Sequence, residues 1–181
     1  RTAGRVEVQQ LAAELDVTAE TVRRDLTALE RLNAVNQHLE QNRFTRQGSA
    51  VHNNNLSAGL VMAHAMDIHA GQCYVAVGLG QSGTNIDMVV VNEVGTVVGH
   101  NVLPDPNPWV RFCAASTGQY LVRINQASGN GEYYFAYFEG GADPQLAGLF
   151  GGAQNNQPTA APIDAQTGAR LQAVAQRLSS Q

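Results

Sequence analysis

Two adjacent arginines, Arg23 and Arg24, are flanked by Thr21 and Thr27 in a stretch with helical spacing. In a helix that enters the major groove of double-stranded DNA, side chains near the N-terminal end reach base edges, and the free N–H groups favour a phosphate. We therefore expect Arg23 and Thr27 to face base edges, Arg24 to clamp a phosphate and Asp25 to orient an arginine. The other interpretation is that these charges only solvate a surface helix, and spacing alone favours it.

Two predicted helices position these side chains. Val8–Leu15 is a short amphipathic helix, Asp16-Val17 makes a turn, and Thr18 is placed to cap the next helix with its hydroxyl. The second helix runs from Thr18 to about Arg43, because one apolar stripe continues through it: Val22, Leu26, Leu29, Leu32, Val35 and Leu39. Two helices joined by a tight turn are the arrangement of a helix-turn-helix.

The residue types in this segment are more specific than their spacing. G-R-V-E-V-Q-Q-L-A-A-E-L-D-V-T-A-E-T-V-R-R-D-L-T-A-L-E-R, from Gly4 to Arg31, closely resembles the DNA-binding domain of the DeoR family of bacterial transcriptional regulators. The run T-V-R-R-D-L matches that family's signature in the recognition helix. The resemblance implies a cytoplasmic, homodimeric regulator that binds DNA sequence-specifically, and it makes Thr21, Arg23 and Arg24 the DNA-contacting residues.

The chain departs from the DeoR pattern on both sides of this match. The family places another helix before Gly4, and it follows Arg31 with a small wing and a sugar-phosphate-sensing α/β domain. Here the second helix continues, and nothing downstream resembles that sensor. Because the chain begins at Arg1, inside the pattern, we expect a fragment or processed piece. A fusion of two unrelated pieces near Arg31 stays open.

The overall composition gives no general attraction to nucleic acid. The formal net charge is −4, all 11 basic residues are arginine, and residues 1–46 carry seven arginines against seven acidic residues. Any DNA contact must therefore come from a few placed side chains. No apolar run approaches the roughly 20 residues that span a bilayer, so no membrane segment is expected.

From Asn53 the pattern changes to short apolar or alternating runs separated by Gly, Asn and Pro. The expected strands are Gly59–Ile68, Cys73–Leu79, Ile86–Asn92, Thr96–Asn101, Trp109–Ala114, Gln119–Asn125 and Glu132–Phe138, with hairpin turns at 93–95 and 128–131. Seven short strands without intervening helices indicate an antiparallel β-sandwich of jelly-roll or immunoglobulin-like type. The predicted fold class is mainly β with helical ends.

Four segments are expected along the chain. Residues 1–46 form an incomplete helix-turn-helix that runs into a long helix, 53–139 the β-sandwich, 140–162 a linker and 163–181 a C-terminal helix. R-L-Q-A-V-A-Q-R-L, Arg170–Leu178, matches R-L-N-A-V-N-Q-H-L, Arg31–Leu39, in six of nine places. This similarity favours a repeat of helix plus sandwich over two unrelated amphipathic helices.

The strand pattern over about 56–140 resembles the small β-sandwich modules of secreted bacterial proteins, such as pre-peptidase C-terminal domains. The resemblance implies a non-catalytic binding module in a secreted or periplasmic protein. Cys73 opens one predicted strand and Cys113 closes another, so an inter-strand or inter-sheet disulfide fits that context. Two buried free thiols in a cytosolic protein are the alternative.

No catalytic constellation is visible, and no cofactor or metal site is expected. None of the five histidines has zinc-ligand spacing, and His64 is expected on a strand surface. Asp67, Asp87 and Asp105 would bind Ca²⁺ only if they converge, and solvent exposure is favoured. The aromatic run Tyr133–Phe138 has one face for a core, and its other face could bind a carbohydrate or a protein.

The sequence alone leaves two possible functions open. The first is sequence-specific DNA binding by a transcriptional regulator, because only the helix-turn-helix points to a particular chemistry. The alternative is a non-catalytic binding or repeat module of a secreted or cell-envelope bacterial protein, with the N-terminal helices as packing or fusion.

Overall fold

The computed structural model describes residues 7–140, without the side chains of Asn54 and Asn55. Two helices precede eight strands: α1 (Val8–Glu14), α2 (Ala19–Gln41), β1 (Thr45–Leu56), β2 (Val61–Ile68), β3 (Cys73–Gly80), β4 (Asn85–Val91), β5 (Val97–Asn101), β6 (Trp109–Cys113), β7 (Gly118–Ser128) and β8 (Gly131–Glu139). The linker predicted up to 162, the helix predicted over 163–181 and the repeat copy at Arg170–Leu178 lie outside the described residues.

Both predicted N-terminal helices are confirmed, as is the turn between them. Asp16 reverses the chain with a φ of 53°. Thr18 then caps α2, because its hydroxyl oxygen accepts a hydrogen bond from the backbone N of Thr21 at 3.1 Å. Ala12 of α1 and Val22 of α2 are buried where the two helices pack together.

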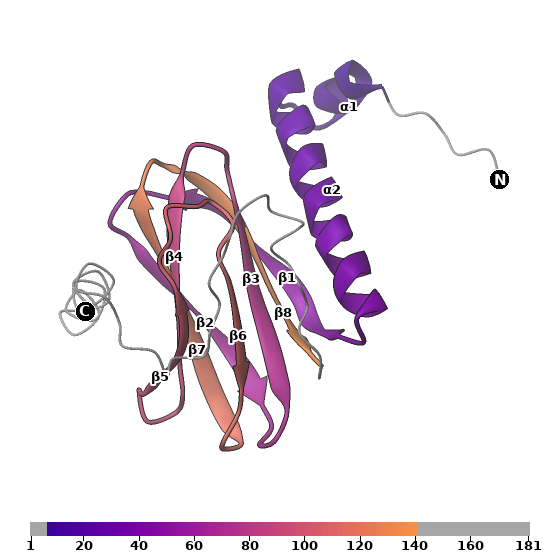
Figure 1. Ribbon diagram of the computed structural model, residues 1–181. Coiled ribbons are helices and arrows are strands. Elements are labelled where there is room, and N and C mark those ends of the chain that lie inside the picture. Colours follow the sequence, from indigo (N-terminus) through magenta and orange to yellow (C-terminus); the bar gives the residue numbers. More distant parts are fainter. Residues whose placement is uncertain (1–6, 141–181) are drawn as a thin grey trace.

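The strands form two four-stranded antiparallel sheets, in the orders β1-β8-β3-β6 and β2-β7-β4-β5 (Figure 1). Four strand pairs make up these sheets: β1 with β8, β2 with β7, β3 with β6 and β4 with β5. Together they correspond to one long hairpin that is folded over into two layers. This is the jelly-roll arrangement. The predicted antiparallel β-sandwich is confirmed, and the strand order selects the jelly roll over the immunoglobulin-like topology.

The strand β1 is an eighth strand that the sequence pattern does not predict. Its sequence, T-R-Q-G-S-A-V-H-N-N-N-L, has no regular apolar alternation. It lies at a sheet edge, and its register with β8 shifts between Gln47 and Val51 and again between Asn53 and Leu56. Bulged edge strands have this weak signature, because only part of one face needs to be apolar.

The space between the two sheets holds the larger core cluster. Its fully buried members include Met66, Tyr74, Met88, Phe112, Tyr120, Val122, Ile124 and Tyr133. Tyr120, Val122 and Ile124 all belong to this cluster, so the alternation along β7 marks its inward face, as the sequence indicates.

The predicted hairpin turns are confirmed at Gly95 and Gly129, whose φ values of 81° and 78° favour glycine.

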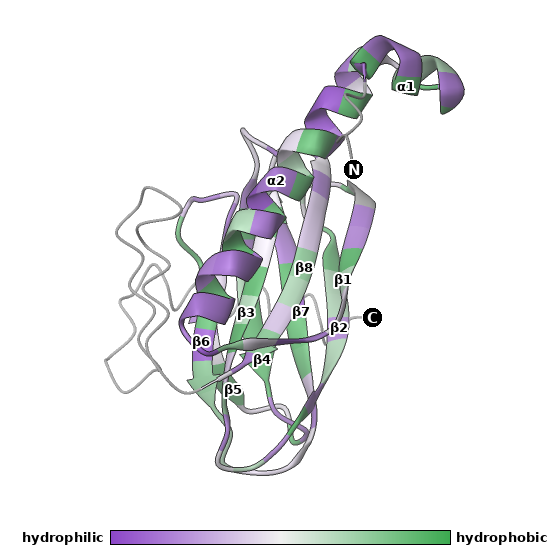
Figure 2. Ribbon diagram, turned by 90° about the vertical axis from the view of Figure 1, so that its right-hand side faces the viewer, coloured by the Kyte–Doolittle hydropathy of each residue, from purple (hydrophilic) through white to green (hydrophobic). Residues whose placement is uncertain are grey.

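The helix α2 covers the outer face of the β1-β8-β3-β6 sheet (Figure 2). Leu32, Val35 and Leu39 pack there with side chains of the sheet, namely Val75, Val77, Leu79, Trp109, Tyr134, Ala136 and Phe138. Each large side chain that is fully buried contributes about 1.5–3 kcal/mol. The C-terminal half of α2 is thus part of the sandwich core, whereas α1 and the start of α2 project past the end of the sheet.

The aromatic strand β8 is covered on both faces. Tyr133 and Phe135 point between the sheets, and Tyr134 and Phe138 point outward into the cluster under α2. The expectation that the second face is free for a carbohydrate or a protein is therefore wrong for the residues under α2. The helix that covers them was predicted, but its position on the sandwich was not.

His64 and Asp87 also differ from their predicted surface positions. His64 points inward from β2, its Nε2 lies 2.6 Å from Tyr133 Oη, and its ring stacks on Phe135. Burial lowers the pKa of His64. Asp87 is buried, and its Oδ2 accepts a hydrogen bond from Asn125 at 3.0 Å. Within residues 7–140 no group of three or more His, Cys, Asp or Glu side chains could hold a metal ion.

Candidate nucleic-acid interface on α2

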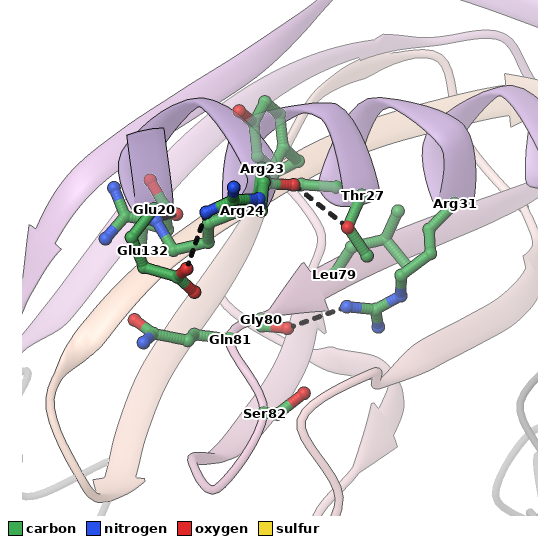
Figure 3. Close-up of a pocket in the computed structure, with 12 residues that line it drawn as sticks. Glu20, Arg23, Arg24, Thr27, Arg31, Leu79, Gly80, Gln81, Ser82 and Glu132 are labelled. Carbon is green, nitrogen blue, oxygen red and sulfur yellow. Dashed lines mark hydrogen bonds and ion pairs between the residues drawn. The ribbon is translucent and has the colours of Figure 1, made fainter. Parts of the chain in front are cut away.

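The first half of α2 presents three faces, because each residue turns by about 100° around the axis. Val22 faces α1. Arg23 and Thr27, one turn apart, lie on an exposed face. Arg24 and Arg31 turn toward the sandwich, where both find partners (Figure 3). All four predicted DNA-contacting residues thus lie on one short segment. Arg23, Arg24 and Thr27 line the space between α2 and the sandwich, and Thr21 does not.

The two threonines are engaged within α2. The Oγ of Thr21 lies 2.8 Å from the Oγ of Thr18, and the Thr21 backbone N bonds the same oxygen. Thr27 donates its hydroxyl hydrogen to the carbonyl oxygen of Arg23 at 3.0 Å. Thr21 therefore forms part of the helix cap, while Thr27 presents its methyl group and an oxygen that can still accept a hydrogen bond.

Arg23 is the most available cation of the site. Its side chain is 53% exposed, and its partner within α2 is Glu20, at 3.6 Å. An exposed ion pair of this kind contributes about 0–1 kcal/mol and is easily exchanged for another anion. Arg23 is therefore free to approach a base edge or a phosphate.

Arg24 is held by the sandwich. Its Nε lies 2.6 Å from Oε1 of Glu132, which is only 8% exposed. The other oxygen of Glu132 lies 3.0 Å from Nε2 of His52, and the His52 ring stacks on Tyr134 with centroids 4.3 Å apart. Asp25, expected to orient an arginine, lies 3.6 Å from Arg24.

Arg31 joins the same face of α2 to the end of β3 and to the loop between β5 and β6. It donates from Nη1 to the carbonyl oxygen of Gly80 at 3.2 Å and from Nη2 to Oδ1 of Asn107. Burial lowers the pKa of Arg31, and the charge of Asp105 acts in the opposite direction. No local pattern in the sequence marks Arg31 as a contact residue.

A cavity of about 280 Å³ separates the first half of α2 from the sandwich. Arg23, Arg24 and Arg31 line it, with Glu20 and Glu132 as the acidic members of the lining. The lining therefore carries one net positive charge. Arg23, Arg24 and Thr27 therefore border a space that they share with Glu132 and Tyr134 of β8 (Figure 3).

Four apolar side chains around the turn remain exposed. They are Leu15 and Val17 near the end of α1, and Leu26 and Leu29 on α2. The apolar stripe of α2 thus divides among three environments: α1 buries Val22, the sandwich buries the residues from Leu32 onward, and the stretch between them faces solvent.

The two cysteines lie apart from α2. Cys73 and Cys113 face each other directly in the register of β3 and β6, and the structure joins them in a disulfide. The bond connects two strands of one sheet rather than the two sheets. Neither α1 nor α2 has the length and apolar content of a membrane-crossing helix.

Residues 1–42 match the family model of the DeoR-like helix-turn-helix domain. The resemblance seen in the motif residues is thereby confirmed, and the match extends past Arg31, where the sequence analysis places the departure from the family pattern. No curated protein matches the chain.

Among solved structures, the chain is similar to PliG, a periplasmic inhibitor of g-type lysozyme from Aeromonas hydrophila, with 14% identity, a TM-score of 0.42 and coverage of 52% of this chain and 92% of that one. It is also similar to the pre-peptidase C-terminal domain of a Bacillus anthracis collagenase, with 12% identity, a TM-score of 0.43 and coverage of 49% and 87%. A carbohydrate-binding module of Cellvibrio mixtus lichenase 5A has 12% identity, a TM-score of 0.34 and coverage of 55% and 91%. Likenesses at this level do not extend to what this chain binds.

Proposed function

We propose that this chain is a non-catalytic, sequence-specific DNA-binding protein that regulates transcription and reads DNA with the first half of α2. The match of residues 1–42 to the DeoR-like helix-turn-helix domain carries this proposal. Arg23 and Thr27 would face base edges in the major groove, and Arg24 would bind a phosphate. Thr21, which is part of the helix cap, would help the N–H groups at the start of α2 to face a phosphate of the DNA backbone.

The charge of the chain determines how strongly DNA binding would depend on salt. The chain has a net charge of −4, so no broad positive field supports it. Affinity would rest on a few arginine contacts, and each phosphate contact lowers the binding constant as salt rises. We further propose a cytoplasmic homodimer, since helix-turn-helix proteins commonly place two reading helices about one turn of DNA apart.

The first experiment is selection of bound duplexes from a random double-stranded library, followed by anisotropy titration of the enriched duplex. The variant R23A/R24A should lose binding by at least tenfold, since two charge-assisted contacts disappear. R46A removes one positive charge from an exposed position on β1 and should show far less than half of that effect. Enrichment of no sequence, or equal binding by wild type and R23A/R24A, would overturn the proposal.

A second candidate function is supported by the disulfide between Cys73 and Cys113. Such bonds persist in oxidising compartments, which favours a secreted or periplasmic binding module for a carbohydrate or protein ligand. The mass of the protein, isolated from its native cell with free thiols blocked, separates the two candidates. A retained disulfide supports the module, whereas two blocked thiols support the cytoplasmic regulator.

A further inference from the structure

Glu132 is the acidic residue of the sandwich that reaches the proposed DNA-binding face. It lies near the start of β8, and its Oε1 accepts a hydrogen bond from Arg24 at 2.6 Å. His52 fixes the second oxygen at 3.0 Å, and Tyr134 fixes His52 by stacking. Since the carboxylate is nearly buried and held on both oxygens, it cannot swing away from Arg24 without losing both partners.

A carboxylate and a phosphate compete for the same guanidinium donors. Both are bound by arginine through short, charge-assisted hydrogen bonds. We propose that Glu132 competes with a DNA phosphate for Arg24, so that the sandwich sets how tightly α2 holds DNA. This inference rests on the proposed DNA-binding function and assigns to Glu132 the part of an internal competitor.

Contacts other than the Arg24–Glu132 pair also hold α2 on the sandwich. Leu32, Val35 and Leu39 bury the second half of the helix, and Arg31 adds two hydrogen bonds nearer its middle. Arg24, in contrast, is 43% exposed and lies next to the exposed Arg23. A phosphate that approaches Arg23 therefore finds Arg24 beside it, already neutralised by the sandwich.

The test compares E132Q with wild type on the labelled duplex enriched in the selection, about two helical turns long. Freed from its carboxylate, Arg24 should raise affinity roughly three- to tenfold and steepen the slope of log K against log salt by up to about 0.9, the value for one whole phosphate contact, because Glu132 withholds part of that contact in wild type. The gain should vanish in the R24A background. E40Q makes the same change of net charge at an exposed position in the last turn of α2 and should leave the salt slope unchanged.

A measurement without DNA separates this inference from the function on which it rests. The Arg24 Nε–H signal in a ¹H–¹⁵N spectrum should move in E132Q and stay in E40Q, because the Nε–H donates to Glu132. An unmoved signal overturns the inference. A moved signal with unchanged affinity and slope also overturns it while leaving DNA binding intact. Absence of binding by both wild type and E132Q overturns the function and the inference together.

Discussion

Leu26 and Val35 belong to one apolar stripe in the sequence but lie on opposite sides of α2. Leu26 is 41% exposed, and Val35 is 1% exposed under the sandwich. Three successive steps of three residues separate them, and each such step falls about 60° behind a full turn. The apolar stripe therefore rotates by about half a turn around α2. As a result, one side of α2 contacts α1 near its start, and another side contacts the sandwich near its end.

Because of this rotation, replacing Val35 or Leu26 by alanine should lower the free energy of unfolding by different amounts. V35A should lower the free energy of unfolding by about 2 kcal/mol, because it opens a void in a packed cluster. L26A should change it by no more than about 0.5 kcal/mol, because its side chain already faces water. Urea unfolding of the two variants at equal concentration measures both values. A large cost for L26A would mean that another surface covers this residue in solution.

The contacts of Arg31 predict that lysine cannot replace it. R31K keeps the positive charge but loses the planar fork that reaches both Gly80 and Asn107. We expect a loss of about 1–3 kcal/mol in stability, because a buried hydrogen-bond acceptor is left without its donor. R46K is the matched control at an exposed position, and chemical denaturation compares the two. Equal midpoints would contradict the anchoring role of Arg31.

The disulfide predicts a measurable response to reduction. Cys73 and Cys113 are 40 residues apart in sequence, so their bond restricts the unfolded chain considerably. The double variant C73S/C113S should be less stable by about 2–4 kcal/mol, and reductant should produce a similar shift in wild type. If reductant leaves the unfolding midpoint of wild type unchanged, the bond is absent in solution.

Two half-buried histidines predict lower stability in acid. Burial lowers the pKa of His64 and of His100 in the folded state below the ordinary value of 6.5. The unfolded chain therefore takes up protons first, and stability that is complete above pH 6.5 falls as the pH drops below that value. H64Q should weaken this dependence, and H64Q/H100Q should weaken it further. Free energies of unfolding measured between about pH 5 and 8 test the sign, and an unchanged slope would contradict it.

Local chemistry was sufficient to predict most elements of this fold. The Thr18 cap, the turn at Asp16 and the glycine turns at Gly95 and Gly129 are visible in the sequence because each requires particular residue types at particular positions. The alternation in β7 likewise predicts its inward face, because one sheet face is buried.

The tertiary contacts of the candidate site could not be predicted in the same way. Nothing near Arg24 in the sequence indicates that Glu132 pairs with it, since only the docking of α2 on the sheet brings them together. The strand β1 was missed because its bulges interrupt any period. The DeoR-like match was expected to end at Arg31, but it continues to residue 42, so it includes the part of α2 that packs on the sandwich.

The outermost strand pair of the jelly roll has a consequence for protein engineering. Thr45, the first residue of β1, is the register partner of Glu139, the last residue of β8, so the sandwich begins and ends at one point. Neighbouring ends are the condition under which circular permutation and domain insertion succeed. A permuted chain that joins these ends with a short linker and opens at Gly95 keeps every strand pairing, but it also cuts α2 from β1. Because α2 buries the outer face of the sheet, the helix would have to be supplied as a separate peptide for that face to stay covered.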